Sequence, residues 1–330
     1  MLARMPSDAA PPDIVALADA RSTARRARDW ATADRLRGEI EAAGWRVIDA
    51  ASLYSLERAV APDVVEDGRT RYGSSGAVPS RLEDEPVGFA TVVLAATDEP
   101  DELARRLRSL VDHAPDGVQV VVVANAPAPA QAAALDALDA LDPGAPGILT
   151  EVVWTSQRLG HAAALNAGIR RSGASIVILL GAGVEVAGDF VTPLVEALED
   201  PAVAVAGPYG LVSADLRLFS EAAGRRADVT AITGDALAFR RADYAEHGPL
   251  DEHFQSRELL DVWWTLVLRD VEGGPPRRAV RVPDLPVVRH ERHDARDTTA
   301  DPGAERAAKK NRYRVLKRFA TRRDLAVPGT

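Results

Sequence analysis

Cysteine is absent from this chain of 330 residues. The chain therefore has no disulfide bond, no thiolate nucleophile and no cysteine ligand for a metal ion. It also lacks an apolar run of the roughly 18–20 residues that a membrane-spanning helix needs. Its first residues, MLARMPSDAAPPD, have no apolar centre of the kind found in signal peptides. We therefore expect a soluble, cytoplasmic protein.

The composition is that of a folded protein with a sizeable core. Hydrophobic residues make up 46% of the chain, charged residues 27%, and the formal net charge is −9. An acidic balance argues against nucleic-acid binding by the protein as a whole, although it leaves room for local basic patches. The length allows either one large domain with an appendage or two domains.

Residues 1–61 predict a small helical module. Apolar residues recur at helical spacing through residues 14–43, and Asp29 is suited to cap a second helix within this stretch. Gly44 is suited to end that helix, and the sequence WRVIDA then predicts an extended segment. Residues 62–87 are rich in proline, glycine, serine and charge, which predicts a linker.

From residue 88 to residue 300 the pattern is typical of an α/β domain. Buried strands are expected at FATVVLAA, VQVVVVAN, TEVVWT and SIVILL, with helical segments between them. Continuous apolar strands that alternate with helices predict a mostly parallel sheet covered on both faces. A basic helix is expected within residues 301–330.

A glycine-rich turn, IVILLGAGVEVAGDF, follows the fourth expected strand. A dinucleotide fingerprint needs the pattern G-x-G-x-x-G at a strand-to-helix turn. Gly181 and Gly183 supply two of its glycines, but Val186 occupies the third position. A dinucleotide site is therefore the weaker of two interpretations of this turn.

The second interpretation rests on a resemblance to the family 2 glycosyltransferases, which have the fold called GT-A. Five segments resemble that family and follow one another in its order. They are TVVLAATDEPDELARRLRSL, VVVVANAP, RLGHAAALNAGIRRSGASIVILL, GDALAFRRADYAEHGPLDEHF and ELLDVWWTLVLRD. The resemblance implies a GT-A-like domain with a mostly parallel sheet flanked by helices, preceded here by the small helical module.

The resemblance also implies an activity, namely hexosyl-type transfer from a nucleotide-sugar donor. The acceptor would be a glycan, a lipid-linked molecule or a protein. Such a donor carries a diphosphate that Mn²⁺ or Mg²⁺ usually neutralises, and hard cations of this kind bind carboxylate oxygens. A further carboxylate would take the proton from the acceptor hydroxyl.

The sequence departs from the family's pattern at three acidic positions. Ala124, followed by Asn125, stands at the end of the second strand. Gly181 and Gly183 occupy the usual metal-binding positions, which leaves Glu185 nearby. The late acidic pair keeps Glu258, whereas the next residue is leucine and Asp261 follows it. A relative that binds a nucleotide, a glycan or a protein without catalysis therefore remains an alternative.

The resemblance assigns roles to the residues that remain. We expect Glu258 or Asp261 to act as the base, and Glu185 and His290 to hold the metal. Asp261 has a structural alternative as a helix surface charge or an ion pair with a nearby arginine, and His290 as an exposed loop residue. Residues expected at the donor are Thr97, Asn125, Gly160, Asn166, Gly168 and Asp235.

Three other features have more than one interpretation. One of Trp263 and Trp264 is expected in the core, and the other to stack on a sugar or seal a partner surface. Residues 14–59 resemble the C-terminal helical segment of cysteinyl-tRNA synthetases, so contact with RNA is an alternative to a solvated, charge-balanced face. The C-terminal helix, with Tyr313, Leu316 and Phe319 on one side, is expected to cap the domain or to lie on the inner membrane face.

Overall fold

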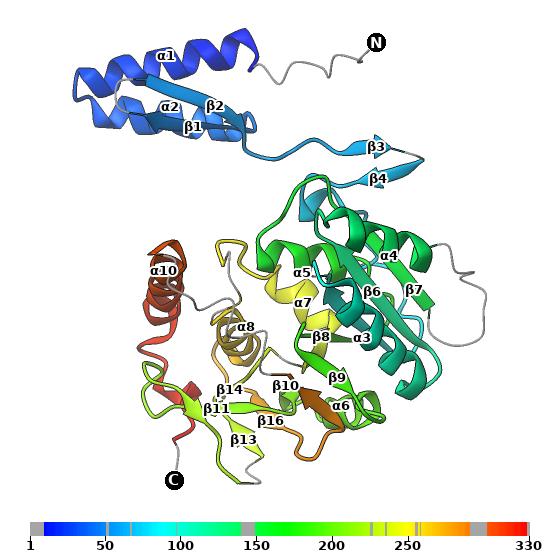
Figure 1. The fold of residues 1–330 in the computed structure, drawn as a ribbon. Helices are drawn as coiled ribbons and strands as arrows, with labels where there is room; N and C mark the ends of the chain where they lie inside the picture. Colours follow the sequence, from blue (N-terminus) through cyan, green and yellow to red (C-terminus); the bar gives the residue numbers. More distant parts are fainter. Residues whose placement is uncertain are drawn as a thin grey trace. The chain divides into compact units, whose positions relative to one another are not determined.

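The computed structural model describes residues 10–50, 53–66, 68–96, 98–139, 149–224, 227–234, 236–254, 257, 259–290 and 302–328 (Figure 1). The chain divides into two compact units, Met1–Pro62 and Asp63–Thr330. Each unit has hydrophobic clusters of its own, because none of the three clusters joins residues from both units.

The first unit is a helical pair followed by a β-hairpin. Its elements are α1 (Pro12–Arg26), α2 (Trp30–Ala42), β1 (Trp45–Ala50) and β2 (Leu53–Arg58), and the two strands pair antiparallel. The predicted helix break is confirmed, since the Asp29 carboxylate accepts a hydrogen bond from the Thr32 N–H at 3.1 Å. Gly44 has a φ of +79°, a conformation that favours glycine after a helix. Ile14, Ala18, Ile40 and Trp45 form the small core.

The second unit begins with the segment that the composition predicts to be a linker. It contains β3 (Val64–Glu66), β4 (Arg69–Arg71) and the short 3₁₀ helix η1 (Ser75–Ala77). The Tyr72 N–H donates to the Trp154 carbonyl at 2.8 Å, and Val78 is fully buried in the main core. This segment therefore packs on the second unit.

The centre of the second unit is an eight-stranded sheet with the order β13-β16-β10-β15-β8-β5-β6-β7. β5, β6, β7, β8, β10 and β16 run in one direction, while β13 and β15 run against their neighbours. The prediction of a mostly parallel sheet is thus confirmed. The strands are β5 (Ala90–Ala95), β6 (Val118–Ala124), β7 (Leu149–Trp154), β8 (Ile176–Leu180), β10 (Val203–Gly207), β13 (Asp228–Val229), β15 (Ala236–Arg240) and β16 (Arg278–Arg281).

Helices cover both faces of this sheet. Alternate strand residues point to opposite faces, so Val92 and Leu94 join one hydrophobic cluster and Val93 joins the other. On the first face lie α3 (Pro100–His113), α4 (Pro129–Asp139) and α6 (Val191–Ala197), and on the second lie α5 (His161–Ile169), α7 (Arg241–His247) and α8 (Leu260–Arg269).

Short strands extend the edges of the domain. β9 (Val184–Val186) pairs antiparallel with β17 (Val287–Arg289). A second small sheet joins β11 (Gly210–Val212), β12 (Ser220–Glu221) and β14 (Ala231–Ile232), and the 3₁₀ helix η3 (Arg323–Leu325) lies near the C-terminus.

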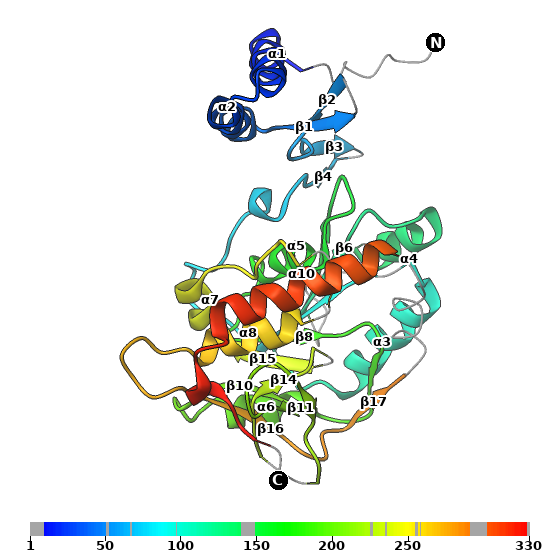
Figure 2. The ribbon, with the colours of Figure 1, turned by 90° about the vertical axis from the view of Figure 1, so that its left-hand side faces the viewer.

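The C-terminal helix α10 (Pro302–Phe319) lies across α8 (Figure 2). Val315 and Phe319 are buried, and the Phe319 ring meets that of Trp263 edge to face at 5.4 Å. The prediction that Tyr313 belongs to the apolar side of this helix is therefore wrong, because its side chain is 67% exposed. Trp264 is the core tryptophan. Among the described residues, no helix is long and apolar enough to cross a membrane.

Candidate active site

The order of the strands creates a crevice at the carboxyl end of β5. From β5 the chain proceeds outward through β6 and β7, and then returns to β8 on the other side of β5. In open α/β sheets, ligands bind outside the carboxyl ends of the strands at such a switch point. The fold therefore indicates where a binding site belongs.

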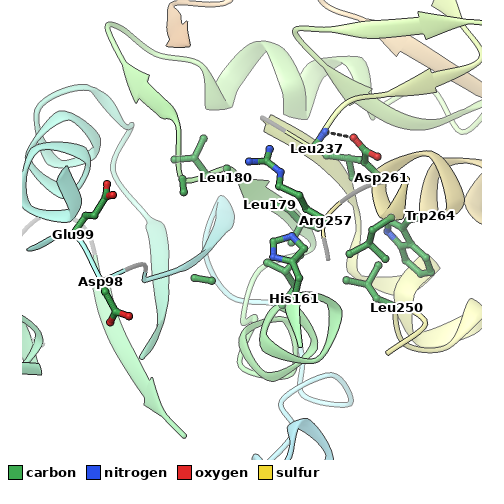
Figure 3. Close-up of a pocket in the computed structure, with 16 residues that line it drawn as sticks. Asp98, Glu99, His161, Leu179, Leu180, Leu237, Leu250, Arg257, Asp261 and Trp264 are labelled. Carbon is green, nitrogen blue, oxygen red and sulfur yellow. Dashed lines mark hydrogen bonds between the residues drawn. The ribbon is translucent and has the colours of Figure 1, made fainter. Parts of the chain in front are cut away.

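A cavity of about 480 Å³ lies at this point. Its walls come from the ends of β5 and β8, the start of α5 and the start of α8. Figure 3 shows Asp98 and Glu99 on one side of the cavity, with His161 and Arg257 facing them. Leu179, Leu180, Leu237, Leu250, Leu260 and Trp264 supply its apolar wall. An apolar cavity with a few charged groups at its rim is typical of small-molecule sites.

Asp261 lies at the rim of this cavity, in the first turn of α8. One carboxylate oxygen, Oδ2, accepts a hydrogen bond from the Gly234 N–H at 2.7 Å. The helix begins after Leu259, whose φ of +59° is unusual for a residue other than glycine. The other carboxylate oxygen, Oδ1, accepts a hydrogen bond from the Val262 N–H at 2.8 Å, so the start of α8 holds both oxygens.

Asp98 holds the opposite wall in place. Its carboxylate accepts hydrogen bonds from the Ala128 N–H at 2.8 Å and from the Arg158 guanidinium. The backbone hydrogen bond from Ala128, followed by that from Arg158, lowers the pKa of Asp98. The cavity therefore keeps an ionised carboxylate on this side at neutral pH.

Glu185 and His290 lie together, although 105 residues separate them in sequence. The pairing of β9 with β17 places them at the same edge, with Glu185 Oε2 and His290 Nε2 3.0 Å apart. They line a second cavity of about 180 Å³, which shares Ala182 with the first cavity. The two residues expected to hold a metal are thus brought together.

A larger metal cluster is not found in the described part of the chain. No group of three or more histidine, aspartate or glutamate side chains there is arranged to hold a metal ion. Any cation held by Glu185 and His290 would take its other ligands from a bound substrate and from water.

Three of the residues expected at the donor are instead hydrogen-bonded to, or closely packed against, other parts of the protein. Asn125 donates to the Leu159 carbonyl at 2.9 Å and accepts from the Leu159 N–H at 2.7 Å. Asn166 is 1% exposed, and its amide bonds with the backbone of Leu250 and with the Tyr244 hydroxyl. At Gly168 an added Cβ would collide with two valines of β5 and β6. These contacts indicate a structural role, in holding loops and in close packing, for all three residues.

The remaining expected residues are placed as follows. Gly160 is the residue before α5, which brings the next residue, His161, into the larger cavity. Thr97, Asp235 and Glu258 lie outside the described residues.

Several residues at the two cavities are absent from the sequence-based expectations. His161 immediately follows the expected Gly160, so its position at the start of a helix was a usable signal. Arg106 lines the smaller cavity and shares the buried face of α3 with Leu103 and Leu110. An arginine in register with core leucines was likewise a usable signal. Asp98, Glu99 and Arg257 carry no comparable signal, because each lies in a loop or just before a helix.

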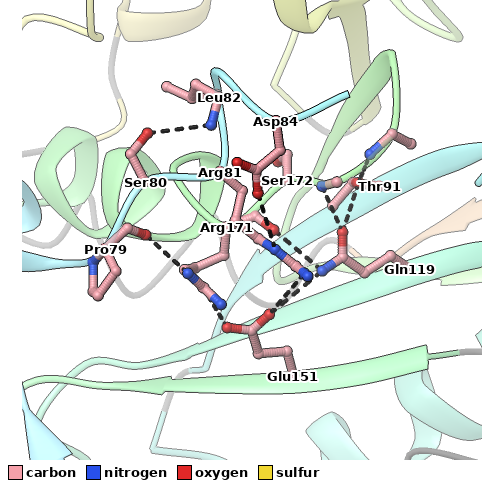
Figure 4. Close-up of polar contacts among 12 residues, drawn as sticks. Pro79, Ser80, Arg81, Leu82, Asp84, Thr91, Gln119, Glu151, Arg171 and Ser172 are labelled. Atoms are coloured by element: carbon pink, nitrogen blue, oxygen red, sulfur yellow. Dashed lines mark hydrogen bonds and ion pairs between the residues drawn. The ribbon is translucent and has the colours of Figure 1, made fainter. Parts of the chain in front are cut away.

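The opposite end of the sheet is closed by a polar network (Figure 4). Gln119 accepts hydrogen bonds from the Thr91 hydroxyl at 2.9 Å and the Gly173 N–H at 2.8 Å. Glu151 pairs there with Arg171 and lies 3.8 Å from Arg81. These residues stand at the amino ends of β5, β6 and β7, so they hold the sheet together far from the switch point.

A comparison with protein families places the site in context. The family model described as Glycosyl transferase family 2 matches residues 91–242. This segment is a family 2 glycosyltransferase domain. It contains β5 through β15, including both glycines of the turn after β8, and so it supplies most of the larger cavity.

A solved structure agrees with this fold. The glycosyltransferase domain and its surroundings are similar to the crystal structure of GalNAc-T7 with UDP, GalNAc and Mn²⁺, with a TM-score of 0.55. The two chains are 16% identical over 81% of this chain and 53% of that one. At that identity the likeness confirms the GT-A fold alone. The mannosyltransferase PcManGT from Pyrobaculum calidifontis, in complex with GDP-Man and Mn²⁺, is 18% identical over 74% of this chain and 78% of that one, with a TM-score of 0.43.

A curated relative matches a short stretch. The cysteine–tRNA ligase of Opitutus terrae (strain DSM 11246 / JCM 15787 / PB90-1) is 50% identical over 54 residues. The match covers 16% of this chain and 12% of the ligase. The chain thus spans a small part of that enzyme and about half of the GalNAc-T7 chain.

Proposed function

We propose that the glycosyltransferase domain transfers a sugar from a nucleotide-sugar donor to a hydroxyl of a glycan, a lipid-linked molecule or a protein. The observation that carries this proposal is the 480 Å³ cavity at the switch point of a family 2 domain, with Asp261 at its rim. The apolar wall suits a sugar ring, and the charged rim suits its hydroxyls and phosphates.

Asp261 is the candidate base among the described residues. Its Oδ2 accepts the Gly234 N–H and its Oδ1 accepts the Val262 N–H, which fixes the carboxylate in the cavity lining. A carboxylate held in this way can accept a proton from an acceptor hydroxyl as that hydroxyl attacks the sugar. Arg257 and His161, on the same side of the cavity, can orient the donor or the acceptor by hydrogen bonds.

The residues present fit a divalent cation of modest affinity. A carboxylate oxygen and an imidazole nitrogen 3.0 Å apart can bind neighbouring positions of one Mn²⁺ ion. Such an ion, when bound, neutralises the leaving diphosphate. Glu185 and His290 would hold it, and the remaining ligands would come from the donor's phosphates and water.

A binding role without catalysis is the second candidate. The observation that favours it is the missing third metal ligand among the described residues. The short match to a cysteine–tRNA ligase supports a third, separate hypothesis, that the N-terminal unit contacts RNA. The near balance of its arginines and acidic residues argues against that hypothesis.

A panel of nucleotide sugars separates these functions. We expect at least one UDP- or GDP-sugar to raise the melting temperature of the full chain, more strongly with Mn²⁺ than with EDTA. The same sugar nucleotide should then be hydrolysed slowly, which free UDP or GDP reports. Binding without any release of nucleotide diphosphate would favour the non-catalytic role, and no binding by any member would reject both sugar transfer and non-catalytic binding of a nucleotide.

A further inference from the structure

Arg106 is a buried cation without a hydrogen-bonding partner. Arg106 is 3% exposed, and its three guanidinium nitrogens have no hydrogen-bond partner among the described residues. A guanidinium carries five N–H donors, and leaving them unpaired away from water is costly. Desolvation by burial lowers the pKa of Arg106 to about 10, which still leaves it charged at neutral pH.

Two other buried arginines in this unit have hydrogen-bond partners for their guanidinium groups. Arg269, 4% exposed, donates to the carbonyls of Thr230, Leu325 and Arg277 at 2.6–2.9 Å. Arg241, 5% exposed, donates to several carbonyls, including that of Asp84 at 2.6 Å. The fold can therefore satisfy a buried guanidinium with backbone oxygens, and at Arg106 it does not.

Arg106 is one of the residues that line the smaller cavity, of about 180 Å³, and its guanidinium nitrogens are buried at the cavity wall. The two acidic residues of its lining already have basic neighbours: Glu185 is 3.0 Å from His290, and Glu102 is 4.0 Å from Arg105. Glu99 and Glu102 attract Arg106 through space, but neither gives it a hydrogen bond. A buried positive charge with unpaired donors thus borders a cavity whose own acidic residues already have basic neighbours.

We propose that this cavity is an oxyanion subsite in which Arg106 binds a phosphate group directly. The planar fork of a guanidinium matches two oxygens of a phosphate, and the bond is charge-assisted. Because Ala182 borders both cavities, a ligand in the larger cavity can extend its phosphates past the glycine turn toward Arg106. The assignment of this phosphate to the donor's diphosphate rests on the proposed function.

The consequence is a phosphate affinity that does not require a metal ion. At the turn itself Gly181 and Gly183 present no side chain, so they leave the approach to Arg106 open. Arg106 supplies one positive charge from α3, on the side of the turn away from Asp261. Removing it should weaken phosphate binding even when every divalent cation has been chelated.

The test uses the full chain in EDTA, with inorganic pyrophosphate and UDP as separate probes in isothermal titration calorimetry. We expect both probes to bind. Arg106→Gln should raise each dissociation constant by about 10-fold to 100-fold, as expected for the loss of a hydrogen-bonded charge pair. The matched control is Arg108→Gln, which changes an exposed arginine of the same helix and should leave both constants unchanged.

Two further variants separate binding from folding. Arg106→Lys keeps the charge without the fork, so it should retain part of the affinity. Arg106→Met removes a desolvated charge, so its melting temperature without ligand should equal or exceed that of the wild type. A loss of affinity in a variant that is at least as stable as the wild type then reports the anion contact alone.

The outcomes separate the two proposals. Wild-type affinities retained by Arg106→Gln would overturn the oxyanion subsite, and a nucleotide sugar still bound and cleaved would leave the proposed function standing. Pyrophosphate bound through Arg106 without any nucleotide-sugar binding would support the subsite and overturn the proposed donor. Failure of the wild type to bind pyrophosphate or UDP in EDTA would overturn the subsite.

Discussion

The single carboxylate of Asp261 carries the most specific prediction at the scale of one residue. Asp261→Asn keeps one oxygen, which can accept the Gly234 N–H but leaves the Val262 N–H without its present acceptor, so the fold should survive with a small loss of stability. It removes the base, and general-base catalysis contributes about 10²-fold to 10⁴-fold. We expect kcat for sugar transfer to fall by that range, while donor affinity changes little.

The measurement is steady-state kinetics on the best donor from the panel, together with the melting temperature of each variant. A kcat within about threefold of the wild type would rule out Asp261 as the base. The position would then serve only to hold Gly234 and the start of α8.

Gly168 makes a prediction about packing. An alanine Cβ there would come within 2.9 Å of Val123 Cγ2 and closer still to Val93. We expect Gly168→Ala to lower the free energy of unfolding by about 1–3 kcal/mol, the usual cost of overpacking. Urea denaturation measures it, and adding Val93→Ala should restore part of the loss. An unchanged midpoint for Gly168→Ala would contradict the close approach of α5 to the sheet.

Asp49 makes a prediction about pH in the N-terminal unit. The side-chain hydrogen bond from Arg21, the largest cause, lowers the pKa of Asp49 from 3.8 to about 2. Because the folded pKa lies below the unfolded one, this contribution is present above pH 4 and disappears as pH falls toward 2. Protection of β1 and β2 amides against hydrogen exchange should decline over that window in the wild type.

The matched variant is Asp49→Asn, which should be less protected than the wild type at pH 6 and should lose its extra acid sensitivity between pH 4 and 2. The carboxylate is 42% exposed, so the effect is local and screened by salt. Identical acid profiles for the two proteins would show that the pair with Arg21 does not stabilise the hairpin.

At the same scale, sequence alone places some residues and misses others for clear reasons. Glu185 and His290 come together through a β-pairing that no local pattern reveals, so only the family resemblance predicted them. Asn166 looked like a donor residue because of its motif, whereas its amide is enclosed by Tyr244 and Leu250. A sequence motif does not distinguish a side chain that binds a ligand from one that binds the backbone.

Among the elements, α10 depends on a narrow apolar face. Phe319 is fully buried against Trp263, while Tyr313 on the same helix is 67% exposed. We expect Phe319→Ala to lower the free energy of unfolding by about 3–5 kcal/mol and Tyr313→Ala to change it by less than about 0.5 kcal/mol. Equal effects in urea denaturation would contradict the packing of α10 on α8.

Long elements were predictable, and short ones were not. β5, β6, β7 and β8 are continuous apolar runs, and α3 begins with Pro100, a residue suited to the first turn of a helix. β9, β12 and β17 have two or three residues each, too few for a period to emerge. The pairing of β9 with β17 joins segments distant in sequence, and it places Glu185 beside His290.

For the whole molecule, the separate hydrophobic clusters predict that the two units act independently. A chain cut after Pro62 should leave residues 63–330 with an unchanged dissociation constant for the best nucleotide probe, because both cavities are lined by that unit alone. Calorimetry on the purified fragment and on the full chain measures this. A loss of affinity greater than about fivefold would mean that the N-terminal unit contributes to binding.

The polar network at the amino ends of β5, β6 and β7 has a consequence for how such a protein can change over time. Gln119, Glu151 and Arg171 hold the strands together at one end of the sheet, and the residues that line the larger cavity lie at the other end. Substitutions in the ligand-bearing loops therefore leave the securing contacts intact. Glycines can therefore replace acidic residues after β8, and a cationic residue can arise on α3, without loss of the contacts that hold the sheet together.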